Sequence, residues 1–117
     1  MNMDIFRGKQ TESGEWIEGE LQIIGTIVRS ESGCFINGFR IVPETMGRFT
    51  RKCDRNGKRI FAGDIVRYSS TDSEMLGVIE EYDVEFIFKP KVGYGCPIPS
   101  SQDLVIIGNI FDNPDSF

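Results

Sequence analysis

The chain has 117 residues, of which 39% are hydrophobic and 26% charged, and its formal net charge at pH 7 is -5. A chain of this length buries enough apolar surface to fold as one domain without disulfide or metal support. The composition excludes a disordered chain, and the longest apolar runs fall far short of the roughly 20 residues that a membrane-spanning helix needs. Asp4 and Arg7 interrupt the N-terminus before the apolar region of a signal peptide can form, so we expect a cytoplasmic protein.

Residues 1–42 predict a meander of short strands divided by turns. Ser13-Gly14 and Asn37-Gly38 are turn dipeptides, and residues 31–33 suit the loop of a hairpin. Gly19 lies inside an apolar run, where it predicts a bulge or a close backbone approach. The expected strands are residues 16–24, 26–29, 34–36 and 39–42, with 26–29 and 34–36 paired across the loop.

Residues 43–59 predict a basic connecting segment. Pro43 ends the preceding strand because it has no N–H to donate, and residues 44–46 can form a single helical turn after it. Asn56-Gly57 is the strongest short-range turn signal of the chain, since both residues tolerate a positive φ and fit the mirror-image hairpin turn.

Residues 60–117 predict a small barrel-like core. The expected strands are 60–61, 64–68, 80–88 and 104–107, with a polar loop at 69–74 and a connection or edge strand at 89–101. Apolar and acidic side chains alternate over 80–88, as in a half-buried strand. Residues 104–107 are apolar on both faces, as in a central or interface strand. The fold class is therefore mainly β: an N-terminal meander packed on an SH3-like barrel, with only short helical turns.

The residue chemistry does not indicate an enzyme. The chain contains no histidine, and its cysteines, Cys34, Cys53 and Cys96, include no Cys-x-x-Cys pair, so we expect free thiols, no metal and no cofactor. Acid–base catalysis would need a carboxylate, cysteine or lysine with a shifted pKa, and the sequence shows no arrangement that shifts one. Asp64, which follows Gly63, is expected to accept backbone hydrogen bonds at a strand entry rather than to act as a site carboxylate.

Charge is unevenly distributed along the chain. Residues 48–59 hold six basic side chains and one acidic one, whereas the rest of the chain holds seven basic and seventeen acidic residues. Residues 70–88 hold six acidic residues and no basic one. Such asymmetry can steer partners or pair subunits, because local potential decides close encounters. The candidate contact residues are Arg48, Phe49, Arg51, Lys52, Arg55, Lys58 and Arg59, and the candidate acidic face is Glu81, Asp83 and Glu85.

Several uses of these charges remain open. The basic segment can contact nucleic-acid phosphates, with Phe49 and Phe61 stacking on unpaired bases, although the acidic remainder of the chain would repel that partner. It can instead meet the acidic strand of a second subunit and fix the register of a dimer or ring. Acids within the same subunit can also screen it. The acidic strand can gather a divalent cation, but a solvated outer face is the simpler interpretation.

Three motifs occur in a fixed order and, with the opening residues 6–19, span nearly all of the chain. They are Val-Pro-Glu-Thr at 42–45, Asp-x-Asn-Gly-Lys-x-Ile-x-x-Gly-Asp-Ile-Val at 54–66, and Ile-Gly-Asn-Ile-x-x-Asn-Pro at 107–114. Together these residues resemble the YopX family of phage and prophage proteins. The resemblance implies a phage-encoded protein in a bacterial cytoplasm, a mostly β fold with a barrel-like core, and no catalytic residue to carry over.

The chain departs from the family pattern at two positions. Family members usually have Thr-Gly where this chain has Thr50-Arg51, and commonly an acidic residue where it has Ala62, so the segment is more basic here. With the charge pattern, the resemblance predicts a phage accessory protein that acts as a non-enzymatic, homo-oligomeric binding module. A host or phage protein is a further candidate partner, and nucleic-acid binding through residues 48–59 is the alternative function.

Overall fold

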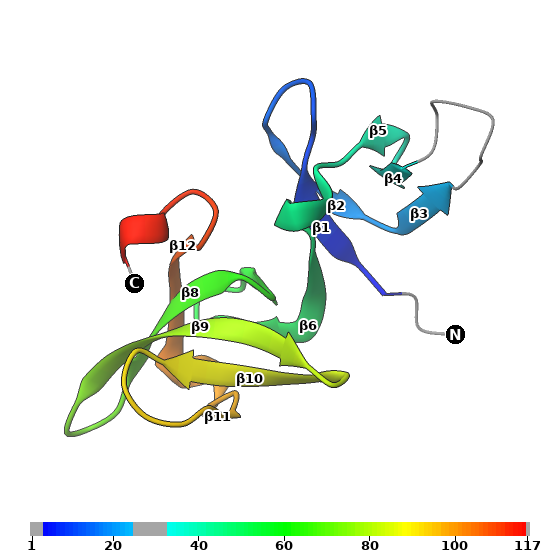
Figure 1. Ribbon diagram of the computed structural model, residues 1–117. Coiled ribbons are helices and arrows are strands. Elements are labelled where there is room, and N and C mark those ends of the chain that lie inside the picture. The colour runs from blue at the N-terminus through cyan, green and yellow to red at the C-terminus, as the bar shows by residue number, and fades with distance from the viewer. Residues whose placement is uncertain (1–3, 25–32, 117) are drawn as a thin grey trace. The chain divides into compact units, whose positions relative to one another are not determined.

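A computed structural model describes residues 4–24 and 33–116 (Figure 1). The protein is mainly β, as the sequence predicts. The helical elements of the described residues are three 3₁₀ turns: η1 (Pro43–Thr45), η2 (Ser101–Asp103) and η3 (Pro114–Ser116). None of the helices in this part of the chain has the length and apolar character that crossing a membrane requires. The chain forms two compact units, Met1–Phe49 (unit 1) and Thr50–Phe117 (unit 2).

Unit 1 contains two small antiparallel sheets. Its strands are β1 (Phe6–Lys9), β2 (Trp16–Gly19), β3 (Leu21–Ile24), β4 (Gly33–Ile36), β5 (Phe39–Arg40) and the first residues of β6 (Gly47–Cys53). β1 pairs with β2 on one side and with β6 on the other, and β4 lies between β3 and β5. The Trp16 ring centroid lies 4.7 Å from the Arg7 guanidinium carbon and 5.5 Å from Lys9 Nζ. These two cation–π contacts fix one face of the β1–β2 hairpin.

The predicted strand 16–24 is wrong, because the chain changes sheet within it. β2 ends at Gly19, and β3 begins two residues later and pairs with β4. Gly19 is the close approach that its position indicated, since a Cβ there would lie 3.0 Å from the Asn37 side chain. The predicted strand 26–29 lies outside the described residues, and β4 pairs with β3 and with β5.

Asn37-Gly38 and Pro43 act as predicted. Asn37-Gly38 has φ values of 51° and 84° and forms the two-residue turn between β4 and β5. Pro43 opens η1, and the Thr45 hydroxyl accepts a hydrogen bond from the Lys9 N–H at 2.9 Å and donates one to the Val42 carbonyl at 2.7 Å. The Val-Pro-Glu-Thr motif therefore ties a turn to β1.

Unit 2 is built on a five-stranded antiparallel sheet in the order β11-β10-β9-β8-β12 (Figure 1). These strands are β8 (Asp64–Ser69), β9 (Glu74–Tyr82), β10 (Glu85–Pro90), β11 (Cys96–Pro97) and β12 (Leu104–Asn109), and β7 (Arg59–Phe61) lies beside β6. The core holds Ile60, Val66, Ile79, Phe88 and Leu104, each from a different strand. The sheet curls into a half-barrel with β11 and β12 at its edges, and an SH3-like topology stays a prediction.

The predicted strand 80–88 is a hairpin. β9 ends at Tyr82, the chain reverses at Asp83-Val84, and Glu85 begins β10 opposite Tyr82. Asp83 and Val84 have φ values of 53° and 65°. The alternation of apolar and acidic residues continues through this turn, and Asp-Val is not a recognised turn dipeptide, so the pattern concealed the reversal.

Two further expectations need correction. Residues 43–59, expected as a connecting segment, form η1, β6, a turn and the start of β7. Residues 104–107 belong to an edge strand, β12, so the central-strand alternative is wrong, and an interface strand stays a prediction. The outer edge of β12 is covered by the β6–β7 turn, where the Arg55 N–H donates to the Leu104 carbonyl at 2.9 Å. The expected edge strand within 89–101 is confirmed as β11.

Candidate binding groove

The Asp54 carboxylate holds the turn between β6 and β7. Its side chain is buried, and Oδ1 accepts hydrogen bonds from the backbone N–H groups of Asn56 and Lys58, both at 2.9 Å. The Gly57 N–H donates to the Asp54 carbonyl at 3.0 Å. The turn therefore lies where Asn56-Gly57 predicts it, but it is not the mirror-image type, because only Gly57 has a positive φ, of 84°.

The same carboxylate joins this turn to β12. Asp54 Oδ2 accepts a hydrogen bond from the Ile106 N–H at 3.0 Å. Burial by itself would raise the pKa of Asp54, but the N–H groups of Ile106, Lys58 and Asn56 and the charge of Lys58 hold that pKa below its ordinary value of 3.8. Asp54 is consequently ionised at neutral pH, and its oxygens are occupied by structural hydrogen bonds.

Asp64 and Asn109 have comparable structural roles. Asp64 is 1% exposed, and its Oδ2 accepts from the Phe61 N–H at 2.8 Å, as expected for a carboxylate at a strand entry. Asn109 Oδ1 accepts from the N–H groups of Phe111 and Asp112 at 3.0 and 2.9 Å. All three sequence motifs thus build turns, and the polar residues that make them distinctive serve the backbone.

Most of the predicted basic contact residues are exposed. The exposed ones lie in unit 2, on β6, on β7 and in the turn between them: Arg51, Lys52, Arg55, Lys58 and Arg59. Arg48 and Phe49 belong to unit 1 and are half-buried, and Arg48 Nη1 lies 3.5 Å from Asp4 Oδ1. Phe61 is only 1% exposed and packs inside unit 2, so the expectation that it stacks on bases is wrong.

The predicted acidic face is divided by the β9–β10 turn. Glu81 lies on β9, Asp83 in the turn and Glu85 on β10, and all three side chains are exposed. Tyr82, not another acid, is the cross-strand partner of Glu85. Among residues 4–24 and 33–116 no group of three or more acidic or cysteine side chains is placed to hold a metal ion. The expected single acidic strand face is therefore an acidic hairpin tip.

A groove of about 500 Å³ lies in unit 2 between β6 and the β10–β11 edge. Its apolar lining consists of Phe86 and Ile87 from β10 and of Pro97 and Ile98 from the end of β11 and the residue after it. Lys52 enters it from β6 and Glu85 from β10, so opposite charges come from strands of different sheets. Neither side chain makes an ion pair with any residue in the described ranges.

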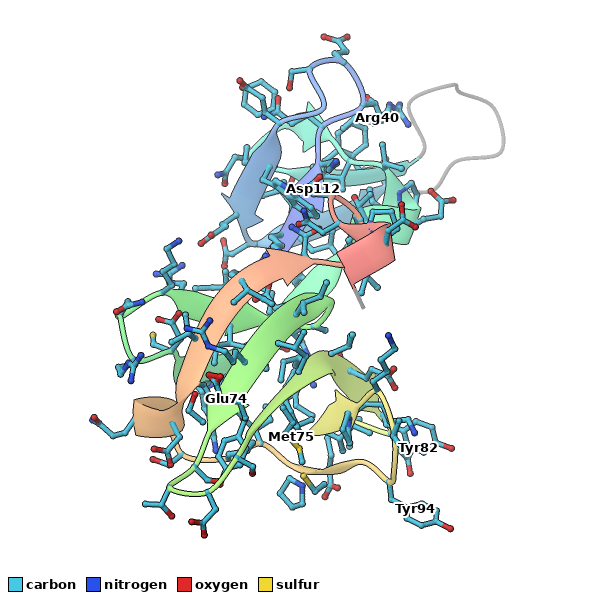
Figure 2. The ribbon with its side chains drawn as sticks, turned by 90° about the vertical axis from the view of Figure 1, so that its left-hand side faces the viewer. Arg40, Glu74, Met75, Tyr82, Tyr94 and Asp112 are labelled. Atoms are coloured by element: carbon cyan, nitrogen blue, oxygen red, sulfur yellow. The ribbon has the colours of Figure 1, made fainter. Side chains whose placement is uncertain are left out.

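Exposed apolar side chains precede groove-lining residues in two stretches of the sequence. Tyr82 and Val84, at the hairpin tip before Glu85, are 71% and 81% exposed. Val92 and Tyr94, in the loop before the groove-lining Gly95, are 87% and 94% exposed, and Figure 2 shows Tyr94 extending away from the ribbon. Where such side chains form one contiguous patch, the patch commonly marks an interaction site.

The cysteines are free, as predicted, and they differ in accessibility. Cys96 is exposed and lines the groove, whereas Cys34 and Cys53 are half-buried. Sequence reasoning singled out Lys52 and Glu85 but missed the remaining lining. Apart from Thr50 on β6, the missed residues follow the Asp83-Val84 reversal, and without that turn β10 and β11 cannot be placed beside β6.

The comparisons with known proteins agree with this fold. The family model of YopX protein matches residues 5–116. The chain belongs to the YopX family. Among solved structures, this YopX-family protein is similar to protein EF1440 from Enterococcus faecalis, at 18% identity and a TM-score of 0.61, with 98% of each chain covered. At that identity the likeness shows the fold alone. No curated protein matches the sequence.

Proposed function

We propose that this YopX-family protein is a phage or prophage accessory protein of the bacterial cytoplasm, and that it acts as a non-enzymatic binding module assembled from copies of itself. Apolar and charged side chains line the same groove in unit 2, and the polar motif residues Asp54, Asp64 and Asn109 are committed to backbone hydrogen bonds. A contact role fits this distribution better than a chemical one.

The observation that carries the proposal is the charge arrangement of the groove. Lys52 and Glu85 both line it, yet neither has an ion-pair partner among the described residues. A surface holding both signs of charge around an apolar lining can meet an identical surface, which makes self-association the simplest use.

Mass measurement in solution tests the proposal. Sedimentation and light scattering at micromolar protein concentration, in low and in high salt, should give a mass of at least twice the chain mass. High salt should weaken the assembly, because screening reduces attraction between exposed charges. A monomer in both conditions rejects self-association.

Nucleic-acid binding is a second candidate, favoured by the position of Arg55 and Lys58. Both side chains are exposed at the β6–β7 turn and can reach phosphates without entering the groove. Titration against single- and double-stranded DNA and RNA at low salt tests it. The candidate requires binding that is lost when Arg55 and Lys58 are both changed to Glu, and it is rejected if binding is absent or insensitive to these changes.

A further inference from the structure

We propose that two copies meet across the groove about a two-fold axis, so that Lys52 of each copy pairs with Glu85 of the other. This inference rests on the proposed self-association and adds its surface and symmetry. Under a two-fold axis, whatever one copy presents to the other is presented back in return. Because the groove contains one cation and one anion from different strands, that operation forms two identical ion pairs.

The apolar surroundings of the groove supply the surface to be buried. A stable interface has an apolar centre in which aromatic side chains are enriched, with charged residues at its rim. Phe86, Ile87 and Ile98 line the groove, and the exposed Tyr82 and Val84 precede Glu85. Lys52 and Glu85 then select the register, while the apolar contacts provide most of the affinity.

A second copy fits this groove better than an extended peptide does. A peptide that adds a strand needs a row of accessible backbone groups along a sheet edge. β11 has only two residues, and Pro97 has no N–H to donate. On β6, the Lys52 N–H already donates to Thr50 Oγ1 at 3.1 Å, and the chain is distorted at Arg51, with φ 69°. The walls of the groove therefore favour contact through side chains.

Reciprocal charge exchange tests the pairing. Lys52→Glu places two acids at each contact and Glu85→Lys places two bases there, so each variant alone should dissociate at least tenfold more readily than the unchanged protein. An equimolar mixture of the two variants should form 1:1 heterodimers, because each contact then joins opposite charges again. Native mass spectrometry resolves the three species when one variant is isotopically labelled.

The controls separate this inference from the proposed function. Arg55→Glu makes the same charge change on the same hairpin, outside the groove, and should leave the dimer intact. Assembly that persists unchanged in both Lys52→Glu and Glu85→Lys overturns the groove pairing while leaving self-association standing. A mixture that forms larger even-numbered species replaces the two-fold dimer with a ring and also overturns the inference.

Cys96 provides an independent readout of the same geometry. In a Cys34→Ser/Cys53→Ser background, two Cys96 thiols line one interface, and a short bismaleimide should link them at protein concentrations where dimers form. Adding Cys96→Ser should abolish the link. Failure to cross-link a protein that is dimeric by mass contradicts contact through the groove.

Discussion

Two hairpin turns of unit 2, β6–β7 and β9–β10, differ in how their conformation is maintained. In the β6–β7 turn, Gly57 takes the positive φ of 84° and the buried Asp54 carboxylate accepts three backbone N–H groups. In the β9–β10 turn, Asp83 and Val84 both have positive φ, and both are exposed. The first turn is therefore stabilised by a glycine at its positive-φ position and by hydrogen bonds to a buried carboxylate. The second accepts backbone strain and presents its side chains to solvent, which is common where a surface makes contacts.

Asp54 should be far more sensitive than Asp83 to the same substitution. Asp54→Asn places an amide NH₂ among N–H donors and should lower the free energy of unfolding by about 2–3 kcal/mol. Asp83→Asn, at an exposed position that also suits Asn, should change it by less than about 0.5 kcal/mol. Urea unfolding of the two variants measures both values. Equal losses would mean that the two turns do not differ as the structure indicates.

The pH dependence of unfolding should report the same carboxylate. The pKa of Asp54 is lower in the folded protein than its ordinary value of 3.8. Its contribution is therefore fully present above pH 3.8 and is lost as the pH falls through the folded pKa, because the unfolded chain binds the proton first. Asp54→Asn should have a shallower loss of stability below pH 3.8 than the unchanged protein. Parallel curves from urea unfolding at a series of pH values would refute this assignment.

Exchanging residue types between the turns should have opposite effects. Val84→Gly removes a β-branched residue from a left-handed conformation and should stabilise the protein by about 1 kcal/mol. Gly57→Val creates that strain and should destabilise it by about 1–2 kcal/mol, since a Cβ at Gly57 meets no atom within 4 Å and only the backbone is affected. Thermal unfolding compares the two. A destabilised Val84→Gly variant would show that the Val84 side chain matters within a single copy.

The smallest effect is expected at Arg51. Its φ of 69° is a conformation that glycine adopts more readily than other residues do. The family resemblance implies Thr-Gly at this step. Arg51→Gly should raise the stability of the folded protein by about 0.5 kcal/mol, since relief of strain is partly offset by the greater freedom of the unfolded chain. Differential scanning calorimetry can detect this increase. A decrease would indicate that contacts of the Arg51 side chain outweigh the strain.

The sequence predicted the elements that have a distinctive local chemistry. Asn37-Gly38, Asn56-Gly57 and Pro43 marked turns at the correct positions, because few residues tolerate those backbone conformations or lack the N–H. Asp64 was predicted to accept backbone hydrogen bonds, and it does. The mainly β class followed from these turns and from the short apolar runs between them.

The remaining features depend on tertiary contacts that local patterns do not encode. The chain passes from one sheet to another at Glu20, between two strands that read as one run. The reversal at Asp83-Val84 uses a residue that turns disfavour, so propensity points the wrong way there. Lys52 and Glu85 were candidates from charge alone, but their shared groove depends on two sheets whose strands are far apart in sequence.

The hydrogen bond from Ile106 to Asp54 joins positions 52 residues apart and has a consequence for biosynthesis. While the ribosome is still translating β8 to β11, Asp54 lacks one of its three donors and β8 lacks its neighbour β12. Nascent chains that stop before residue 104 should therefore remain accessible to chaperones and proteases. Translation of β12 thus supplies the neighbour of β8 and the third donor to Asp54 that unit 2 requires.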